Sequence, residues 1–428
     1  MPFFRSSAYF FALLILGFGL PLETHAQKAL KADLDPIISL PGAYDLTPED
    51  LEKMFEKGSW NRNPYFKWLT KDKSRAIFQR KAMPNLKVDL SLLGGTVPIE
   101  EAIVDFKDGK YLGTTISIYN WGDYNREKSN PSQYEEIQEA DFQARFRSMG
   151  KHLGEQLATR PTRRTAKPTQ GVLTSGYIWI SARGKAVLEH NPIEDGEKKM
   201  FLRMRLARRD AEGAYEAATQ ARPGATARLS DLPRNVRRRA EGDVYVANLP
   251  MVDQGAKGYC VVASAQRLFE YYGIPCDMHQ LGMIAGSDPE RGTSSLDTNR
   301  ELGAIDHLFK TRFECLAVRH QSSLVELKDG KYVGDRIPNE DFHKMIRKSI
   351  DEGIPLLWSL ELGRYPEEPP ISQQTSGGHM RMIIGYNDNE DKIIFSDSWG
   401  AGHEFKKMDA AHALSATQGL FLMKPIVR

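Results

Sequence analysis

The sequence predicts an α+β protein in which two separate domains each combine helices with antiparallel strands. In the first half, apolar residues alternate strictly along residues 86–92, the pattern of a half-buried strand. In the second half, helical stripes precede a series of strands, an order typical of α+β folds. At 428 residues, the chain is long enough for two ordinary domains.

The first 26 residues have the pattern of a secretory signal peptide. Arg5 provides the positive start, Tyr9 to Leu20 is apolar, and the segment ends in small residues before Gln27. The apolar run is shorter than the roughly 20 residues that a membrane-spanning helix needs. We expect cleavage before Gln27, no stable membrane span afterwards, and a secreted or periplasmic location. The alternative is an uncleaved membrane anchor.

Residues 27–206 are predicted to form the N-terminal α+β domain. Thr47 and Pro48 resemble a capping box with proline at the first helical position, so a helix should begin there. Hairpins are expected around residues 107–110 and 183–184, with a polar helix over 133–157 between them. No set of residues in this domain suggests catalysis. Its role stays open between a propeptide and a binding module.

Residues 207–241 are predicted to be a basic linker. The stretch is rich in Ala, Arg and Gly, and it ends in a basic run at residues 234–239. That run lies about twenty residues before the cysteine discussed next, which raises the hypothesis of a processing site. An ordinary solvated linker is the simpler interpretation, so both remain open.

The charge is distributed unevenly although the net charge is only +2. Residues 1–240 contain 38 Lys and Arg and 29 Asp and Glu, whereas the remainder contains 20 and 27. Opposite charges favour intramolecular docking of the N-terminal domain on the second domain. Nucleic-acid binding is not expected, because the basic residues are not interleaved with aromatic ones and no recognition motif is present.

The second domain, residues 242–428, starts with a polar, Gly-rich loop that leads into Cys260 and an apolar helical stripe. A cysteine at a helix N-terminus is favoured as a thiolate, the form that attacks acyl carbons. Gln254 lies six residues upstream and offers a side-chain amide to stabilise an oxyanion together with the Cys260 N–H. The alternative for a lone cysteine is a small buried hydrophobic residue.

Two later segments supply a base and its partner. His379 opens one apolar strand, and Asp397 closes the next one after a polar turn. Neighbouring strands would bring the two side chains together, as a general base is held by an orienting acid. His403 and His412 are weaker candidates, because no strand start places them near the thiol. Further helices and strands are expected at residues 302–309, 342–350, 356–362 and 420–423.

These motifs resemble the papain-like cysteine peptidase superfamily. The resemblance covers the C-terminal half and implies a helical lobe with the nucleophile and an antiparallel-sheet lobe with the histidine. It also implies Cys260 as nucleophile, His379 as base, Asp397 as orienter and Gln254 as oxyanion donor, with Trp399 shielding the histidine.

Three positions depart from the papain pattern. Asp397 replaces the usual asparagine, as in bacterial peptidases with a Cys-His-Asp set, which include the double-glycine type. Lys257 replaces a disulfide-forming cysteine, and Val261 replaces the tryptophan that usually follows the nucleophile. These departures indicate a divergent branch and leave the substrate undetermined.

The resulting prediction is an exported cysteine peptidase that acts on peptide or protein substrates without cofactor or metal. An amidase or transglutaminase-type acyl transferase could use the same residue types, and an inactive binding module is the other alternative. Three cysteines are present. Cys276 and Cys315 are interpreted either as a disulfide that leaves Cys260 free or as two buried thiols.

Overall fold

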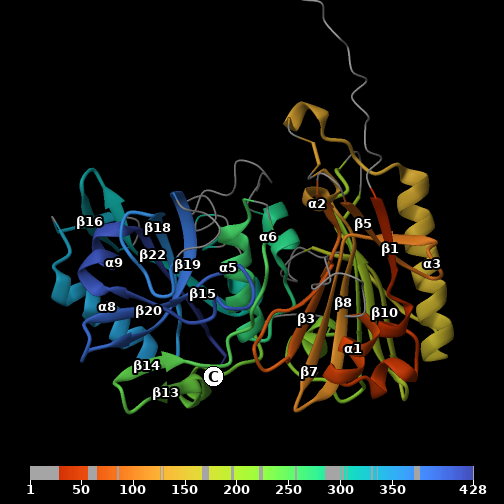
Figure 1. The fold of residues 1–428 in the computed structure, drawn as a ribbon, viewed down its shortest axis with the longest axis horizontal. Helices are drawn as coiled ribbons and strands as arrows, with labels where there is room; N and C mark the ends of the chain where they lie inside the picture. The colour runs from red at the N-terminus through yellow and green to blue at the C-terminus, as the bar shows by residue number, and fades with distance from the viewer. Residues whose placement is uncertain are drawn as a thin grey trace, which may run out of the picture.

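The computed structural model describes residues 28–427 except 56–64, 84–85, 126, 129, 166–172, 194–196, 221–224, 256–257, 285–299, 301–302, 305, 329–330, 335 and 371–375. The predicted signal peptide and Lys257 therefore lie outside the described residues. The described elements confirm the α+β class, with sheets that are largely antiparallel (Figure 1). One hydrophobic cluster lies within residues 32–206 and a second within residues 225–423. We refer to residues 28–220 as the N-terminal half and to residues 225–427 as the C-terminal half.

The N-terminal half contains two sheets. The smaller has the strand order β1-β5-β4, with β6 paired to β5, and the larger has the order β2-β3-β7-β8-β12-β11-β10-β9. The long helix α3 packs against β10 and β11 on the outer side of the molecule (Figure 1). The strands are β1 (Lys28–Asp33), β2 (Phe66–Trp68), β3 (Arg75–Gln79), β4 (Lys81–Met83), β5 (Leu86–Leu92), β6 (Val97–Ile99), β7 (Glu101–Lys107), β8 (Lys110–Asn120), β9 (Thr162–Arg164), β10 (Ser175–Ser181), β11 (Gly184–His190) and β12 (Phe201–Ala207). The helices are α1 (Pro48–Phe55), α2 (Trp121–Asn125), α3 (Glu139–Leu157) and α4 (Ala214–Ala218).

Local sequence signals account for several of these elements. Helix α1 begins at Pro48 as expected, and Thr47 and Asp50 form a reciprocal cap in which the Asp50 N–H donates to Thr47 Oγ1 at 3.2 Å. Strand β5 spans the predicted residues 86–92 and alternates between partly buried and buried positions. Both predicted hairpins form, as β7–β8 and β10–β11.

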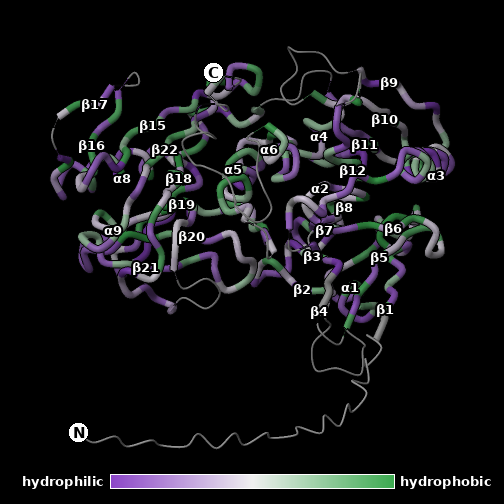
Figure 2. The backbone as a smooth tube through the Cα atoms, turned by 90° about the horizontal axis from the view of Figure 1, so that it is seen from above, coloured by the Kyte–Doolittle hydropathy of each residue, from purple (hydrophilic) through white to green (hydrophobic). Residues whose placement is uncertain are grey.

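The C-terminal half is built on one large sheet with the order β13-β14-β19-β18-β22-β15-β16-β17, to which β20 and β21 are added beside β19. Helices α5 and α6 lie between β19 and the N-terminal half in both views (Figures 1 and 2). The strands are β13 (Val236–Arg238), β14 (Asp243–Val246), β15 (Thr311–His320), β16 (Ser323–Lys328), β17 (Lys331–Val333), β18 (Leu356–Leu362), β19 (Gly377–Asn387), β20 (Lys392–Ser396), β21 (Lys406–Asp409) and β22 (Thr417–Pro425). The helices are α5 (Cys260–Tyr271), α6 (Met278–Ile284), α8 (Asn339–Asp351) and α9 (Ala410–Ala416).

The predicted strands at residues 356–362 and 420–423 appear as β18 and β22, and the two apolar strands expected at His379 and before Asp397 appear as β19 and β20. Strands β15 and β16 were not predicted, because residues 311–320 mix charged and apolar side chains without an alternating pattern. Pairing with β22 makes β15 a strand. Of the helix expected at residues 302–309, residues 303–304 are α-helical and Asp306–Phe309 form a 3₁₀ helix.

Within the predicted linker, the described residues form ordered elements. A 3₁₀ helix spans Leu229–Asn235 and buries Leu232. Strand β13 pairs with β14, and Arg238 forms an ion pair with Asp351 at 2.7 Å. The basic run is thus held against the C-terminal half, although its arginines remain solvent-exposed.

The three cysteines are free thiols. Cys276 and Cys315 are therefore two separate thiols in the structure, which was the second of the two interpretations. Burial raises the pKa of Cys276 well above its ordinary value and that of Cys315 to about 11. Among the described residues, no helix combines the length and the apolar character needed to cross a membrane.

Candidate active site

Helix α5 presents Cys260 at its first residue and uses one face to fasten itself to the strands opposite. Residues 260, 264 and 267 lie on one side of a helix because they are four and three positions apart. The Ser264 hydroxyl donates to the Met380 carbonyl at 3.2 Å, next to His379. The first turn contains no acidic residue, so the partial positive charge of the helix N-terminus acts on Cys260.

Arg267 ties the same helix to the acid of the site. Its guanidinium donates to the Asp397 carbonyl at 2.9 Å, to Ser396 Oγ at 2.7 Å and to the Pro250 carbonyl at 2.7 Å. The side chain is almost fully buried, and its three partners span both the end of β20 and the loop before the cysteine. Helix α5 therefore has a fixed position relative to His379 and Asp397.

The pairing of β19 with β20 brings His379 and Asp397 together. Met382 lies opposite Ser396 in this antiparallel register, so the next residue of the chain, Asp397, reaches the end of β19 that carries His379. His379 Nε2 and Asp397 Oδ1 are 2.5 Å apart, and both side chains are buried.

The electrostatics favour a protonated imidazole. Burial acts against the charged form of His379, but the hydrogen bond with Asp397 and the nearby Cys260 outweigh it and raise the pKa of His379 to about 9. Burial alone would also act against the charged form of Asp397 and raise its pKa, yet the hydrogen bond with His379 and the charge of Arg381 lower the pKa of this carboxyl group. Both the thiol and the carboxylate thus act on the pKa of the imidazole.

Trp399 covers the His379 imidazole. The two rings are stacked with centroids 4.6 Å apart and planes inclined by 26°. His403 packs edge-on against the same indole at 5.5 Å. The ring of His412 stacks on Tyr365 instead of on Trp399. Of the three histidines considered from the sequence, His379 is the one whose imidazole hydrogen-bonds to the Asp397 carboxylate.

Gln254 belongs to a short segment that pairs with the residues after Asp397. Its backbone N–H donates to the Ser398 carbonyl at 3.0 Å, and the Gly400 N–H donates to the Val252 carbonyl at 3.1 Å. The Ser398 hydroxyl donates to Gln254 Oε1 at 2.6 Å, which determines which end of the amide carries the oxygen. The Gln254 side chain is thereby oriented by the same turn that carries Trp399.

Sequence reasoning missed the charged residues behind the acid. Arg381 Nε lies 2.9 Å from Asp397 Oδ2, and its terminal nitrogens contact Glu367 at 2.6 and 3.1 Å. Lys406 reaches Glu367 at 2.5 Å. All four side chains are buried, so two cations balance two carboxylates in the interior.

A signal for Arg381 existed in the sequence. Arg381 is two residues after His379 in an apolar strand, and residues two apart lie on the same face. A charge on the buried face of a strand requires a partner, and the nearby acid is Asp397. Glu367 had no such signal, because it lies in the loop after β18.

Within the described residues, no three His, Cys, Asp or Glu side chains are grouped closely enough to hold a metal ion.

Comparisons with known proteins concern the C-terminal half. Residues 246–417 match the model of the Peptidase_C39 like family, a range that includes Gln254, Cys260, His379 and Asp397. No curated protein matches the sequence significantly. Among solved structures, the chain is similar to xylellain, a cysteine protease from Xylella fastidiosa. The identity is 14% and the TM-score 0.28, over 49% of this chain and 93% of that one, which does not establish a shared fold. The family match confirms that the C-terminal half resembles C39 peptidases and carries a cysteine-type peptidase.

Proposed function

We propose that the chain hydrolyses peptide bonds through an acyl-enzyme formed on Cys260. His379 is the base, Asp397 holds and orients it, and Gln254 stabilises the oxyanion together with the Cys260 N–H. The observation that supports this most strongly is the buried His379 imidazole that hydrogen-bonds to Asp397 at 2.5 Å and whose pKa is raised by both Asp397 and Cys260. The match to a peptidase family supports the same reaction class.

The proposed reaction begins from an ion pair in which His379 has already taken the Cys260 proton. The thiolate attacks the peptide carbonyl, a sulfur–carbon bond forms, and the resulting oxyanion is held by Gln254 and the Cys260 N–H. Collapse of this intermediate breaks the carbon–nitrogen bond while the imidazolium protonates the leaving amine. Water then hydrolyses the thioester with His379 again acting as base.

An aspartate fits the orienting position. A carboxylate accepts the His379 N–H as an asparagine carbonyl would, and its charge also stabilises the imidazolium. Arg381 offsets part of that charge from the other carboxylate oxygen. The proposal includes export, with the mature chain beginning at Gln27, and peptides or proteins outside the cytoplasm as substrates.

Peptide hydrolysis can be tested with a library of peptides from a digested proteome, read by mass spectrometry. We expect new peptide ends with the purified protein and none with Cys260→Ala, while Cys315→Ala behaves like the original chain. Addition of a primary amine separates the alternatives. Products ending in a free carboxylate support hydrolysis, whereas products carrying the amine would instead show an acyl transferase. No product of either kind would contradict the proposal.

Replacement of Gln254 by alanine tests the oxyanion contact. We expect kcat to fall about 100- to 1000-fold, the usual effect of losing one oxyanion donor, while the fold is preserved. Alkylation of Cys260 by iodoacetamide should continue at its original rate, because that reaction forms no oxyanion. Unchanged hydrolysis in Gln254→Ala would remove this residue from the mechanism.

The pH dependence tests the link between Asp397 and His379. Because the raised pKa keeps the imidazole protonated up to about pH 9, the rate of hydrolysis should fall on the alkaline side near that value. Asp397→Asn removes the hydrogen-bonded charge that raises the pKa, so the alkaline limb should move down by about one pH unit or more. Asp388→Asn, a surface carboxylate paired with Arg347, is the control and should leave the limb in place. An unmoved limb in Asp397→Asn would show that this carboxylate does not act on His379.

A further inference from the structure

The N-terminal half reaches the segment that carries Gln254. Lys67 of β2 forms an ion pair with Asp253 Oδ2, one residue before Gln254. The other carboxylate oxygen of Asp253 accepts the Gly255 N–H at 2.7 Å, so this side chain closes the turn around Gln254. Asp253 is buried and also pairs through its backbone with Trp399. A cation from the N-terminal half thus balances the buried acid that shapes this turn.

Arg75 of β3 contacts the same region from the other side. Its guanidinium donates to the Met251 carbonyl at 3.2 Å and pairs with Glu270 of α5 at 2.6 Å. The same group pairs with Asp105 of β7 at 2.9 Å. This one side chain therefore joins the large sheet of the N-terminal half to both the Gln254 segment and the helix of Cys260.

Apolar contacts accompany these ion pairs. Met251 is buried in a small cluster with three residues of the N-terminal half, Leu69, Ile77 and Ile103. Leu69 also packs against Gly400, where an added Cβ atom would lie 3.3 Å from its side chain. The N-terminal half thus contacts both the segment before Gln254, at Met251, and the segment after Asp397 that pairs with it, at Gly400.

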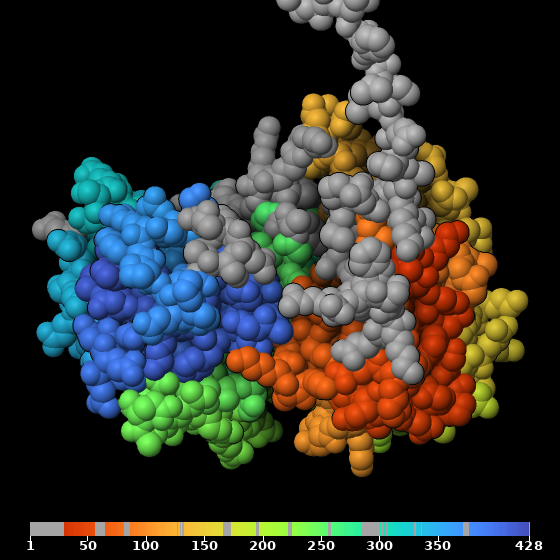
Figure 3. All heavy atoms as spheres, in the orientation of Figure 1, coloured from red at the N-terminus to blue at the C-terminus, as the bar shows by residue number. Residues whose placement is uncertain are grey.

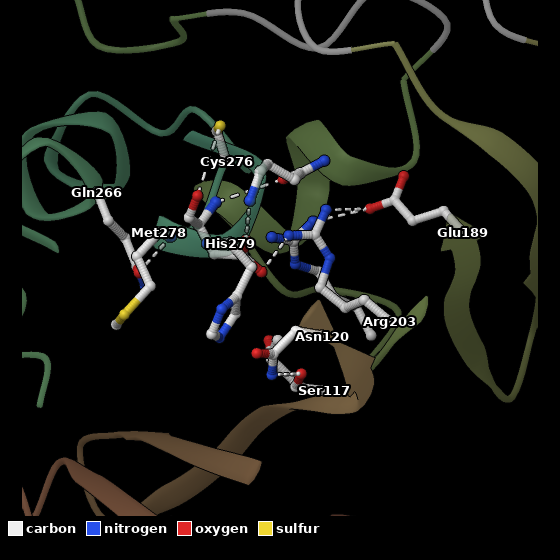
Figure 4. A network of polar contacts seen from close by, with 12 residues as sticks. Ser117, Asn120, Glu189, Arg203, Gln266, Cys276, Met278 and His279 are labelled. Carbon is white, nitrogen blue, oxygen red and sulfur yellow. Dashed lines mark hydrogen bonds and ion pairs between the residues drawn. The ribbon is translucent and has the colours of Figure 1, made fainter. Parts of the chain in front are cut away.

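A second contact lies at the start of α6 (Figure 4). Arg203 of β12 forms ion pairs with Glu189 of its own half and with Asp277 of the C-terminal half. Asp277 in turn accepts the N–H groups of His279 and Gln280 at 3.1 and 3.0 Å, which caps α6. Arg203 is nearly inaccessible to solvent, so the two halves share a desolvated ion pair here.

We propose that the N-terminal half is a permanent part of the catalytic unit and that Lys67 is a positioning residue for Gln254. Without Lys67, the buried Asp253 carboxylate would lack its cation, and the turn that aims the Gln254 amide would lose its fixed shape. This inference rests on the proposed function. The inference argues against a propeptide that must leave. Even if the chain were cut within residues 234–239, the ion pairs that join the two halves would remain in place. Figure 3 shows atoms of the two halves in contact on this face of the molecule.

Lys67→Met tests the inference, and Lys73→Met is a closely matched control. Lys73 is also in the N-terminal half and paired with a carboxylate, and its side chain is 43% exposed against 40% for Lys67, but its partner is Glu52. Lys67→Arg preserves the charge. The readouts are kcat and KM on one peptide cleaved by the original chain, together with the rate of Cys260 alkylation by iodoacetamide.

We expect Lys67→Met to lower kcat about tenfold, a fraction of the roughly 100-fold effect of losing an oxyanion donor outright. KM and Cys260 alkylation should change little, Lys67→Arg should restore most of the loss, and Lys73→Met should match the original chain. Equal kcat in Lys67→Met and Lys73→Met would overturn the inference. Slower Cys260 alkylation in Lys67→Met would also overturn it, because the effect would then not pass through the oxyanion contact.

Failure of the proposed function would look different, because the original chain itself would cleave no peptide. In that case a peptide aldehyde is the probe, since its adduct with the thiol places an oxygen at the same position. Weaker aldehyde inhibition of Cys260 alkylation in Lys67→Met than in Lys73→Met would still support the positioning role. Equal inhibition would contradict it.

Discussion

The site depends on one buried carboxylate. Asp397 receives His379 on one oxygen and Arg381 on the other, and its backbone carbonyl accepts Arg267 from the cysteine helix. Glu367 continues the chain of charges through Arg381, and these side chains are buried. Removing one member of such a set leaves an unpaired buried charge, which costs about 3–5 kcal/mol. The imidazole is therefore held in place by the interior of the protein, not by Asp397 alone.

The sequence predicted the residues that lie at the ends of elements. Cys260 opens an apolar helix, His379 lies at the start of an apolar strand, and Asp397 directly follows the next strand. A periodic pattern marks such ends, and short connections bring neighbouring strands together. Ser264 and Arg267 were missed, although they are one and two turns after Cys260 on the same helical face. Their polar side chains looked like ordinary helical residues until the strands opposite were in place.

The contacts between the halves could not be predicted. Lys67 and Asp253 are 186 residues apart, and a single lysine in a short strand has no local pattern that identifies its partner. The opposite net charges of the two halves predicted that the halves attract each other, but they did not indicate which residues would be in contact. The contacts themselves are the ion pairs of Lys67 with Asp253 and of Arg75 with Glu270.

The most direct test of the account compares the chain's own three cysteines. Iodoacetamide is added to the native protein over a range of pH, and the modification rate of each cysteine is measured by mass spectrometry. We predict that Cys260 reacts at pH 6, where Cys276 and Cys315 stay unmodified because burial raises their pKa values. Replacement of His379 by alanine should remove this advantage. If Cys260 of the original chain, with His379 present, reacted no faster than Cys315, this result would contradict an activated thiol and with it the proposed peptidase site.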